Sequence, residues 1–296
     1  MTKSLSRAAG ILAALILPCA WAAAPPPPIY LGIVETPMVH FVGEKHKTPY
    51  MVRIVFQNKG GKWLAAPTVD SSQVERTTWV SAMPKQIRWT VGFDGKKRGD
   101  FSSDSSGKKN FEGSSAQILQ PEPGGHVPLI KQGASNFQYW ENVSFRPLVC
   151  TSGSYVDDPD AWKPDASKVP QPLWTELLSA FHKADADNAK VADDHIQVQK
   201  TYKSAHGALL ISLIEKKPPG RPEDSGPGDE PEPFWFYVNG PEFRLIDKSL
   251  ELIDAGDYDH DGHSEVVFHK SGYDYDGYVL VCDQMRKQVG FGWSYH

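Results

Sequence analysis

The chain has little cysteine and none of the common catalytic signatures, and both absences narrow what it can do. Three of its 296 residues are cysteines, and no two are spaced as the Cys-x-x-Cys pair that binds zinc or carries thiol redox chemistry. Gly-x-Ser-x-Gly, His-Glu-x-x-His, Gly-x-Gly-x-x-Gly and the phosphate-binding Gly-Lys-Ser/Thr are missing too. The sequence therefore carries none of these catalytic signatures, so we assign no catalytic residue and favour a binding or structural protein over an enzyme.

Long hydrophobic runs are also missing. The longest hydrophobic segment extends from Ala8 to Leu17, which is about half of the roughly 20 residues needed to cross a bilayer. Lys3 and Arg7 flank it on one side and small residues follow it, which is the pattern of a secretory signal peptide. We therefore predict a signal peptide over residues 1–22 and an exported protein, periplasmic or extracellular, that does not span a membrane.

The predicted exported part, taken as a whole, has no excess of positive charge. Residues 23–150 carry fifteen Lys and Arg against ten Asp and Glu, whereas residues 151–296 carry fourteen against twenty-six. A net negative chain is a poor partner for nucleic acid. The asymmetry leaves three interpretations open: the two halves attract each other, the acidic half holds cations, or it presents a solvated acidic face.

Two cysteines, Cys150 and Cys282, remain after the signal peptide. An exported protein can keep a disulfide, so one bridge between them is possible. Two separately buried thiols are the alternative, because cysteines whose Cα atoms lie more than roughly 7 Å apart cannot form a bridge.

The first part, residues 23–150, is predicted to be an antiparallel sheet or sandwich. Its segments are rich in Val, Ile, Trp, Tyr and Phe, and several alternate apolar with polar residues. Asn58 to Gly61 and Asp94-Gly95 supply hairpin turns, whereas the small polar segment from Phe101 to Ser115 is expected to be a loop. The predicted strands are IYLGIVE, PYMVRIVFQ, WLAA, TTWVSAM and QIRWTVGF.

The second part, residues 151–296, is predicted to be α+β. Pro172 can occupy the first turn of a helix whose apolar face is Leu173, Leu177, Leu178 and Phe181. Residues 216–233, rich in proline and acids, are expected to form a disordered surface loop. Short apolar segments from residue 234 onward indicate an antiparallel β-meander. The fold class is thus mainly β, with one helix.

One acidic loop stands out within that meander. Counting from Asp257 as position 1, carboxylates fall at positions 1, 3, 5 and 9, and Gly262 is at position 6. Calcium takes six to eight oxygen ligands, so carboxylates on alternate residues before a sharp turn suit it. An EF-hand would need an acid at position 12, which is Phe268, and helices where the flanking segments are strand-like. Zinc is a minor alternative through the interleaved histidines.

The strand-loop-strand arrangement resembles the FG-GAP and VCBS-like calcium loops of integrin alpha-type repeats. That resemblance implies that Asp257, Asp259, Asp261, the carbonyl of His263 and Glu265 ligate calcium, with Glu in place of the commoner Asp at the last position. The C-terminal sequence also resembles a family of exported bacterial proteins that pair one such loop with a β-rich front half. Because the motif occurs once, we do not expect a β-propeller.

These patterns lead to two functional hypotheses. The first is an exported calcium-binding module that binds a protein or carbohydrate ligand, or has a structural role. The alternative is a hydrolase of cell-envelope or glycan substrates that uses acids of the second part, which would need two carboxylates in one cleft.

Overall fold

The computed structural model describes residues 27–35, 51–66, 84, 86–104, 119–121, 147–154, 157–216, 232–272 and 275–294. The predicted signal peptide, the predicted strand at 77–83 and residues 217–231 of the predicted disordered loop lie outside these residues. No described helix is both long enough and apolar enough to span a membrane.

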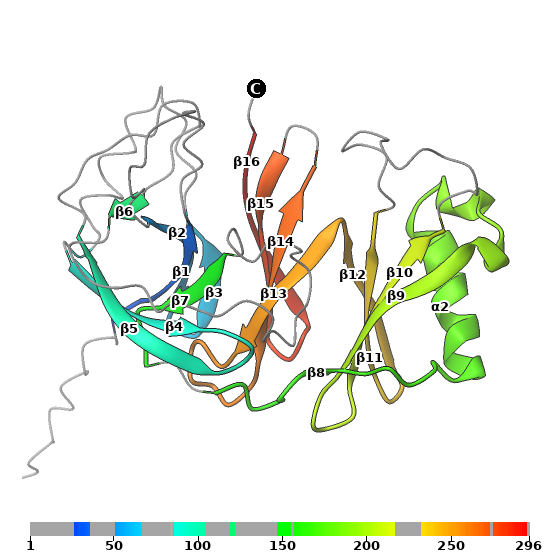
Figure 1. Cartoon of the computed structure of the whole chain (residues 1–296), viewed down its shortest axis with the longest axis horizontal. Helices are drawn as coiled ribbons and strands as arrows, with labels where there is room; N and C mark the ends of the chain where they lie inside the picture. The colour runs from blue at the N-terminus through cyan, green and yellow to red at the C-terminus, as the bar shows by residue number, and fades with distance from the viewer. Residues whose placement is uncertain are drawn as a thin grey trace, which may run out of the picture.

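The first seven strands form one antiparallel sheet, called here the N-terminal sheet (Figure 1). The order is β3-β2-β1-β7-β4-β5, and β6 also pairs with β2. Its strands are β1 (Ile29–Glu35), β2 (Met51–Lys59), β3 (Lys62–Ala65), β4 (Gln86–Gly92), β5 (Lys97–Asp104), β6 (Leu119–Pro121) and β7 (Leu148–Thr151). Because β7 lies between β1 and β4, the chain returns to the middle of this sheet before it enters the second part.

A second antiparallel sheet, the outer sheet, has the order β12-β11-β10-β9-β8. The helix α2 (Gln171–Ala184) covers its outer face, and Leu177 and Phe181 pack there against apolar side chains of β10 and β11. Two short 3-10 turns, η2 (Asn188–Lys190) and η3 (Asp193–His195), lead into β9. The strands are β8 (Lys163–Pro164), β9 (Ile196–Lys203), β10 (Leu209–Glu215), β11 (Phe234–Asn239) and β12 (Glu242–Lys248).

A third sheet, the central sheet, is a four-stranded antiparallel meander. Its strands are β13 (Leu250–Gly256), β14 (Glu265–Ser271), β15 (Tyr275–Cys282) and β16 (Lys287–Ser294). The predicted meander is therefore divided over two sheets. The division falls at Ser249, whose φ of 57° is left-handed and redirects the chain between β12 and β13.

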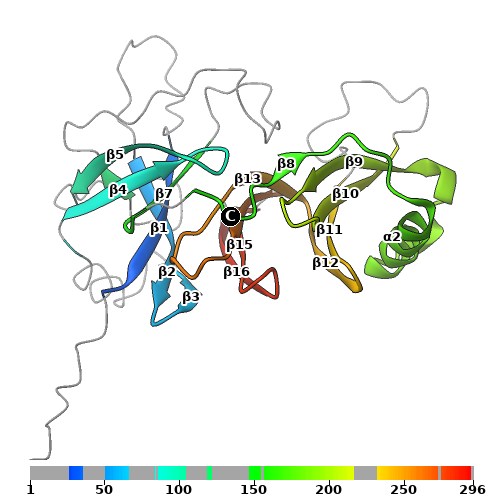
Figure 2. The same cartoon turned by 90° about the horizontal axis from the view of Figure 1, so that it is seen from below.

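The central sheet is covered on both faces (Figures 1 and 2). Val267 and Leu280 face the N-terminal sheet and share a hydrophobic cluster with it. Val266 and Phe268, one residue away in each direction, face the outer sheet and join a second cluster with Trp235. Neighbouring residues on a strand point to opposite faces, so this double burial explains why β14 and β15 contain continuous apolar runs.

The fold class predicted from the sequence, mainly β with one helix, is confirmed. The chain also reverses at the predicted turns. Gly60 and Gly61 have φ of 61° and 78°, and Asp94 and Gly95 have 54° and 68°. The predicted loop at 101–115 is wrong for residues 101–104, which belong to β5. There Phe101 is buried and Ser103 accepts a hydrogen bond from the indole of Trp89, so tertiary contacts outweigh the polar local composition. The division into parts at residue 150 stays a prediction.

Replacing Phe268 with Ala should lower the free energy of unfolding by about 3 to 5 kcal/mol, the usual cost of emptying a buried aromatic site. Phe268 is fully buried, and its ring lies 5.3 Å from that of Trp235 in an edge-on arrangement. Urea unfolding measures the change. Leu245→Ala is the matched control on the exposed side of β12, where the change should stay within about 0.5 kcal/mol; equal losses for the two variants would contradict the layered core.

Candidate metal centre

The acidic loop, residues 257–265, connects β13 to β14 at the end of their hairpin, where Gly256 pairs with Glu265. His260 and Gly262 have φ of 65° and 86°, which reverses the chain within the loop. A side chain at Gly262 would meet no neighbouring atom, so the backbone conformation, not lack of space, favours glycine there. The tight reversal directs the side chains on either side of it toward one point.

Three of the predicted ligands come together: Asp257, Asp259 and Glu265 offer carboxylate oxygens that all lie within 4.8 Å of one another. Asp257 and Glu265 are 5% and 1% exposed, and Asp259 is partly buried. Backbone amides hold two of them in place. Asp257 accepts hydrogen bonds from the N–H groups of Asp261 (3.0 Å) and Gly262 (3.1 Å), and Glu265 Oε2 accepts one from Tyr258 N–H (2.8 Å).

The Asp261 carboxylate does not belong to this group. Asp261 is exposed, and its Oδ1 accepts a hydrogen bond of 2.8 Å from the N–H of His263. The His263 side chain is also exposed, with its Nε2 3.0 Å from the amide nitrogen of Gln284. Ligation by Asp261 and by the His263 carbonyl stays a prediction.

The three gathered carboxylates are electrostatically costly without a cation. Burial, reinforced by the charge of Asp259, raises the pKa of Glu265 to about 9. Burial and then the charge of Asp261 raise the pKa of Asp259. Both shifts have the sign expected when negative charges are desolvated and crowded together. A bound cation would reverse this penalty.

The residues fit a hard cation. Asp259 Oδ1 is inaccessible to solvent and accepts no aligned hydrogen bond from any described residue. The backbone N–H of Asp261 and, more weakly, the indole N–H of Trp63 lie close enough to Asp259 to lower its pKa, although neither forms a hydrogen bond with Oδ1. The gathered ligands are all oxygens, without imidazole or thiolate, which favours calcium or magnesium over zinc.

Contacts from outside the loop were not evident in the sequence. Asn58 of β2 donates a hydrogen bond from its Nδ2 to Asp259 Oδ2 at 2.7 Å. At the other end of the loop, the Ser264 hydroxyl donates to Oδ1 of buried Asp158, whose Oδ2 also accepts the N–H of Trp162. Asn58 and Asp259 are 201 residues apart, so no local pattern could have paired them.

Cys150 and Cys282 are free, buried thiols, which is the second of the two sequence-based alternatives. Both belong to the cluster between the N-terminal and central sheets. Burial raises the pKa of Cys150 well above its ordinary value and that of Cys282 to about 12. Thiols that stay protonated are poor nucleophiles and poor metal ligands.

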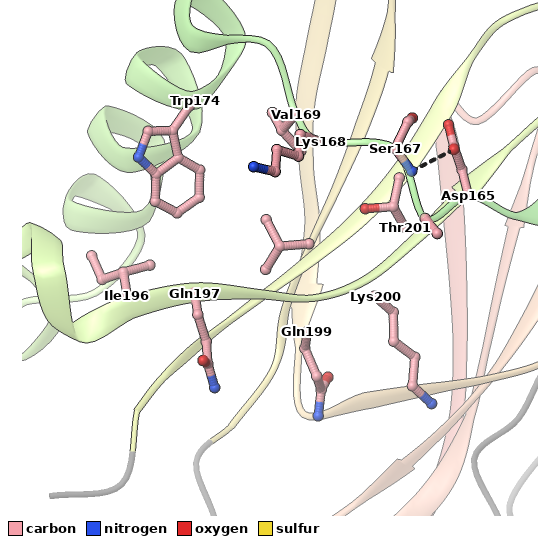
Figure 3. A pocket seen from close by; sticks show the side chains of 12 residues that line it. Asp165, Ser167, Lys168, Val169, Trp174, Ile196, Gln197, Gln199, Lys200 and Thr201 are labelled. Carbon is pink, nitrogen blue, oxygen red and sulfur yellow. Dashed lines mark hydrogen bonds between the residues drawn. The ribbon is translucent and has the colours of Figure 1, made fainter.

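A separate cavity of about 460 Å³ lies beside β9, between the connection at residues 165–169 and the helix α2 (Figure 3). Trp174 and Val169 form its apolar wall, and Asp165 is the one carboxylate among its lining residues. Lys200 also lines it, and burial lowers the pKa of this lysine to about 7, opposed by the charge of Glu251. The cavity is far from closed and does not contain a pair of acids.

Comparisons of the chain with protein-family models, with curated proteins and with solved structures find no match. The likeness of the acidic loop to FG-GAP and VCBS-like repeats therefore stays a hypothesis that rests on the loop residues alone.

The raised pKa of Glu265 predicts how the metal-free protein responds to pH. Between the ordinary pKa of 4.5 and the folded-state value of about 9, the unfolded chain releases a proton that the folded chain keeps. The contribution of Glu265 to the free energy of unfolding is therefore largest below pH 4.5, and it is lost as the pH rises toward 9. Glu265→Gln, which keeps an acceptor for Tyr258 N–H, should flatten this fall and raise stability at pH 8 by at least about 1.4 kcal/mol, the free energy of one pKa unit.

Urea unfolding in a chelating buffer from pH 5 to 9 measures both proteins. Parallel stability curves for the wild type and Glu265→Gln would show that Glu265 is not held protonated in the fold.

Proposed function

We propose that the protein is an exported calcium-binding module in which the acidic loop holds one calcium ion through Asp257, Asp259 and Glu265. The observation that carries the proposal is the convergence of these three carboxylates in a largely buried position, where Asp259 Oδ1 accepts no aligned hydrogen bond from the described residues. Buried charges of one sign are stable when a counter-charge neutralises them.

Calcium suits this site better than other divalent cations. It accepts six to eight oxygens in flexible geometry, so three carboxylates leave positions for Asp261, for the His263 carbonyl or for water. Magnesium demands a near-ideal octahedron and usually keeps several waters, which a buried loop accommodates less readily. Binding would deprotonate Glu265, so calcium affinity should rise with pH.

The role of the ion in this proposal is structural. The loop joins β13 and β14, whose pairing is central to the layered core. A cation there fixes the hairpin and leaves the outer surfaces to bind a protein or carbohydrate ligand.

The hydrolase alternative gains no support from the cavity beside β9. Glycoside hydrolysis uses two carboxylates on opposite sides of the scissile bond, and Asp165 is the single acid that lines this cavity. The gathered loop acids are a poor substitute, because an acid and a base need environments that separate their pKa values, and burial raises the pKa of both Glu265 and Asp259.

Calcium should raise the melting temperature of chelator-treated protein. Loops outside the cell commonly bind calcium at roughly 10⁻⁴ to 10⁻³ M. At a concentration about 100 times the dissociation constant, linkage stabilises the folded state by about 2.7 kcal/mol, or about 5 to 10 °C. Asp259→Ala should abolish the rise, because it removes a ligand. Differential scanning calorimetry with and without calcium measures it.

Asp187→Ala is the charge-matched control, because Asp187 is an exposed acid whose partner is Lys190. It should keep the full calcium response. A melting temperature of the wild type that does not change at 10 mM calcium, or an Asp259→Ala variant that responds like the wild type, would refute the proposed site.

A further inference from the structure

A side chain of the N-terminal sheet, Asn58, forms a hydrogen bond with the acidic loop. Asn58 lies at the end of β2, is 5% exposed, and donates its Nδ2–H to Asp259 Oδ2 across a distance of 2.7 Å. This contact joins the two parts of the chain at the candidate metal centre.

The orientation of the Asn58 amide is fixed by its own hairpin. The N–H of Gly61 donates to Asn58 Oδ1 at 3.0 Å, so the amide presents its NH₂ group, and not its oxygen, to Asp259. This second contact depends on the turn between β2 and β3, where Gly60 and Gly61 both have left-handed φ. The hairpin therefore determines which atom faces the acidic loop.

One oxygen of Asp259 is thereby engaged and the other is left for a ligand. With Oδ2 accepting from Asn58, Oδ1 is the oxygen that is buried without an aligned hydrogen bond. A side chain with one oxygen fixed loses less conformational freedom when its second oxygen binds an ion. Groups that orient metal ligands in this way commonly change metal affinity by 10- to 100-fold when they are removed.

We propose that Asn58 is a positioning residue for the calcium centre, and that the β2–β3 hairpin and the acidic loop are thermodynamically coupled through it. The inference rests on the proposed function. Because coupling free energies are reciprocal, a hairpin that favours calcium binding must itself be stabilised when calcium binds. The ion would then join the N-terminal sheet to the central sheet as well as closing one loop.

Removing the Asn58 side chain tests the first half of the proposal. Asn58→Ala should weaken calcium binding by about 10- to 100-fold in isothermal titration calorimetry. Ser103→Ala is the matched control, because it also removes a buried hydrogen bond of the N-terminal sheet, the one that Ser103 accepts from Trp89. It should lower the melting temperature and leave calcium affinity within about twofold of the wild type.

Hydrogen exchange of the wild-type protein tests the second half and does not depend on a variant that folds. Calcium should slow amide exchange in residues 58–66 as well as in the acidic loop. The turn at Asn239–Gly240, between two strands of the outer sheet, is the internal control and should exchange at the same rate in both conditions.

The outcomes separate the inference from the proposed function. A wild type that binds no calcium refutes both. A wild type that binds calcium while Asn58→Ala keeps the same affinity, or while protection is confined to residues 257–265, overturns the coupling and leaves the calcium centre in place. Equal losses of affinity in Asn58→Ala and Ser103→Ala would also overturn it, because general destabilisation would then explain both.

Discussion

The burial of the central sheet on both faces is the constraint from which the other features follow. Val267 and Leu280 pack toward the N-terminal sheet and Phe268 packs toward the outer sheet, so Asp257 and Glu265 at the base of the acidic loop have little access to water, whereas residues 260–263 at its tip are exposed. A loop in that position can carry acidic side chains only if something offsets their desolvation. The same packing that stabilises the fold therefore creates the electrostatic cost at the acidic loop.

Protonation and metal binding can each offset the desolvation of the acidic side chains, and the two processes compete. Protonation of Glu265, whose pKa burial raises to about 9, removes one charge at neutral pH. A divalent cation neutralises two charges and supplies a partner for Asp259 Oδ1, which protonation of Glu265 does not. In the proposed function, Glu265 is therefore protonated without metal and ionised when calcium binds. Asn58 donates a hydrogen bond to the other oxygen of Asp259, Oδ2, and in our proposal this contact couples the loop to the N-terminal sheet.

Much of the fold follows from local patterns in the sequence. The helix was predictable because Leu177 and Phe181 lie one turn apart after a proline that its first turn tolerates. The left-handed turn at Gly60-Gly61 was predictable for a similarly local reason. Residues 101–104 were misjudged because their small polar side chains resemble a loop, and their strand depends on pairing with β4. The separation of the meander into two sheets at Ser249 likewise has no strong local signal.

The candidate site was predictable in part for the same reason. The spacing of Asp257, Asp259 and Glu265 is local, and these side chains do gather. The exposure of Asp261 depends on how the loop closes, and the contact with Asn58 depends on packing between distant segments. Neither can be read from spacing along the chain.

A crystal structure of the protein grown with calcium would show directly whether the acidic loop binds the ion. We expect one ion bound by carboxylate oxygens of Asp257, Asp259 and Glu265 at roughly 2.3 to 2.6 Å. Crystals in millimolar calcium that show no ion among these three side chains, or an ion held elsewhere on the loop without Glu265, would contradict this expectation.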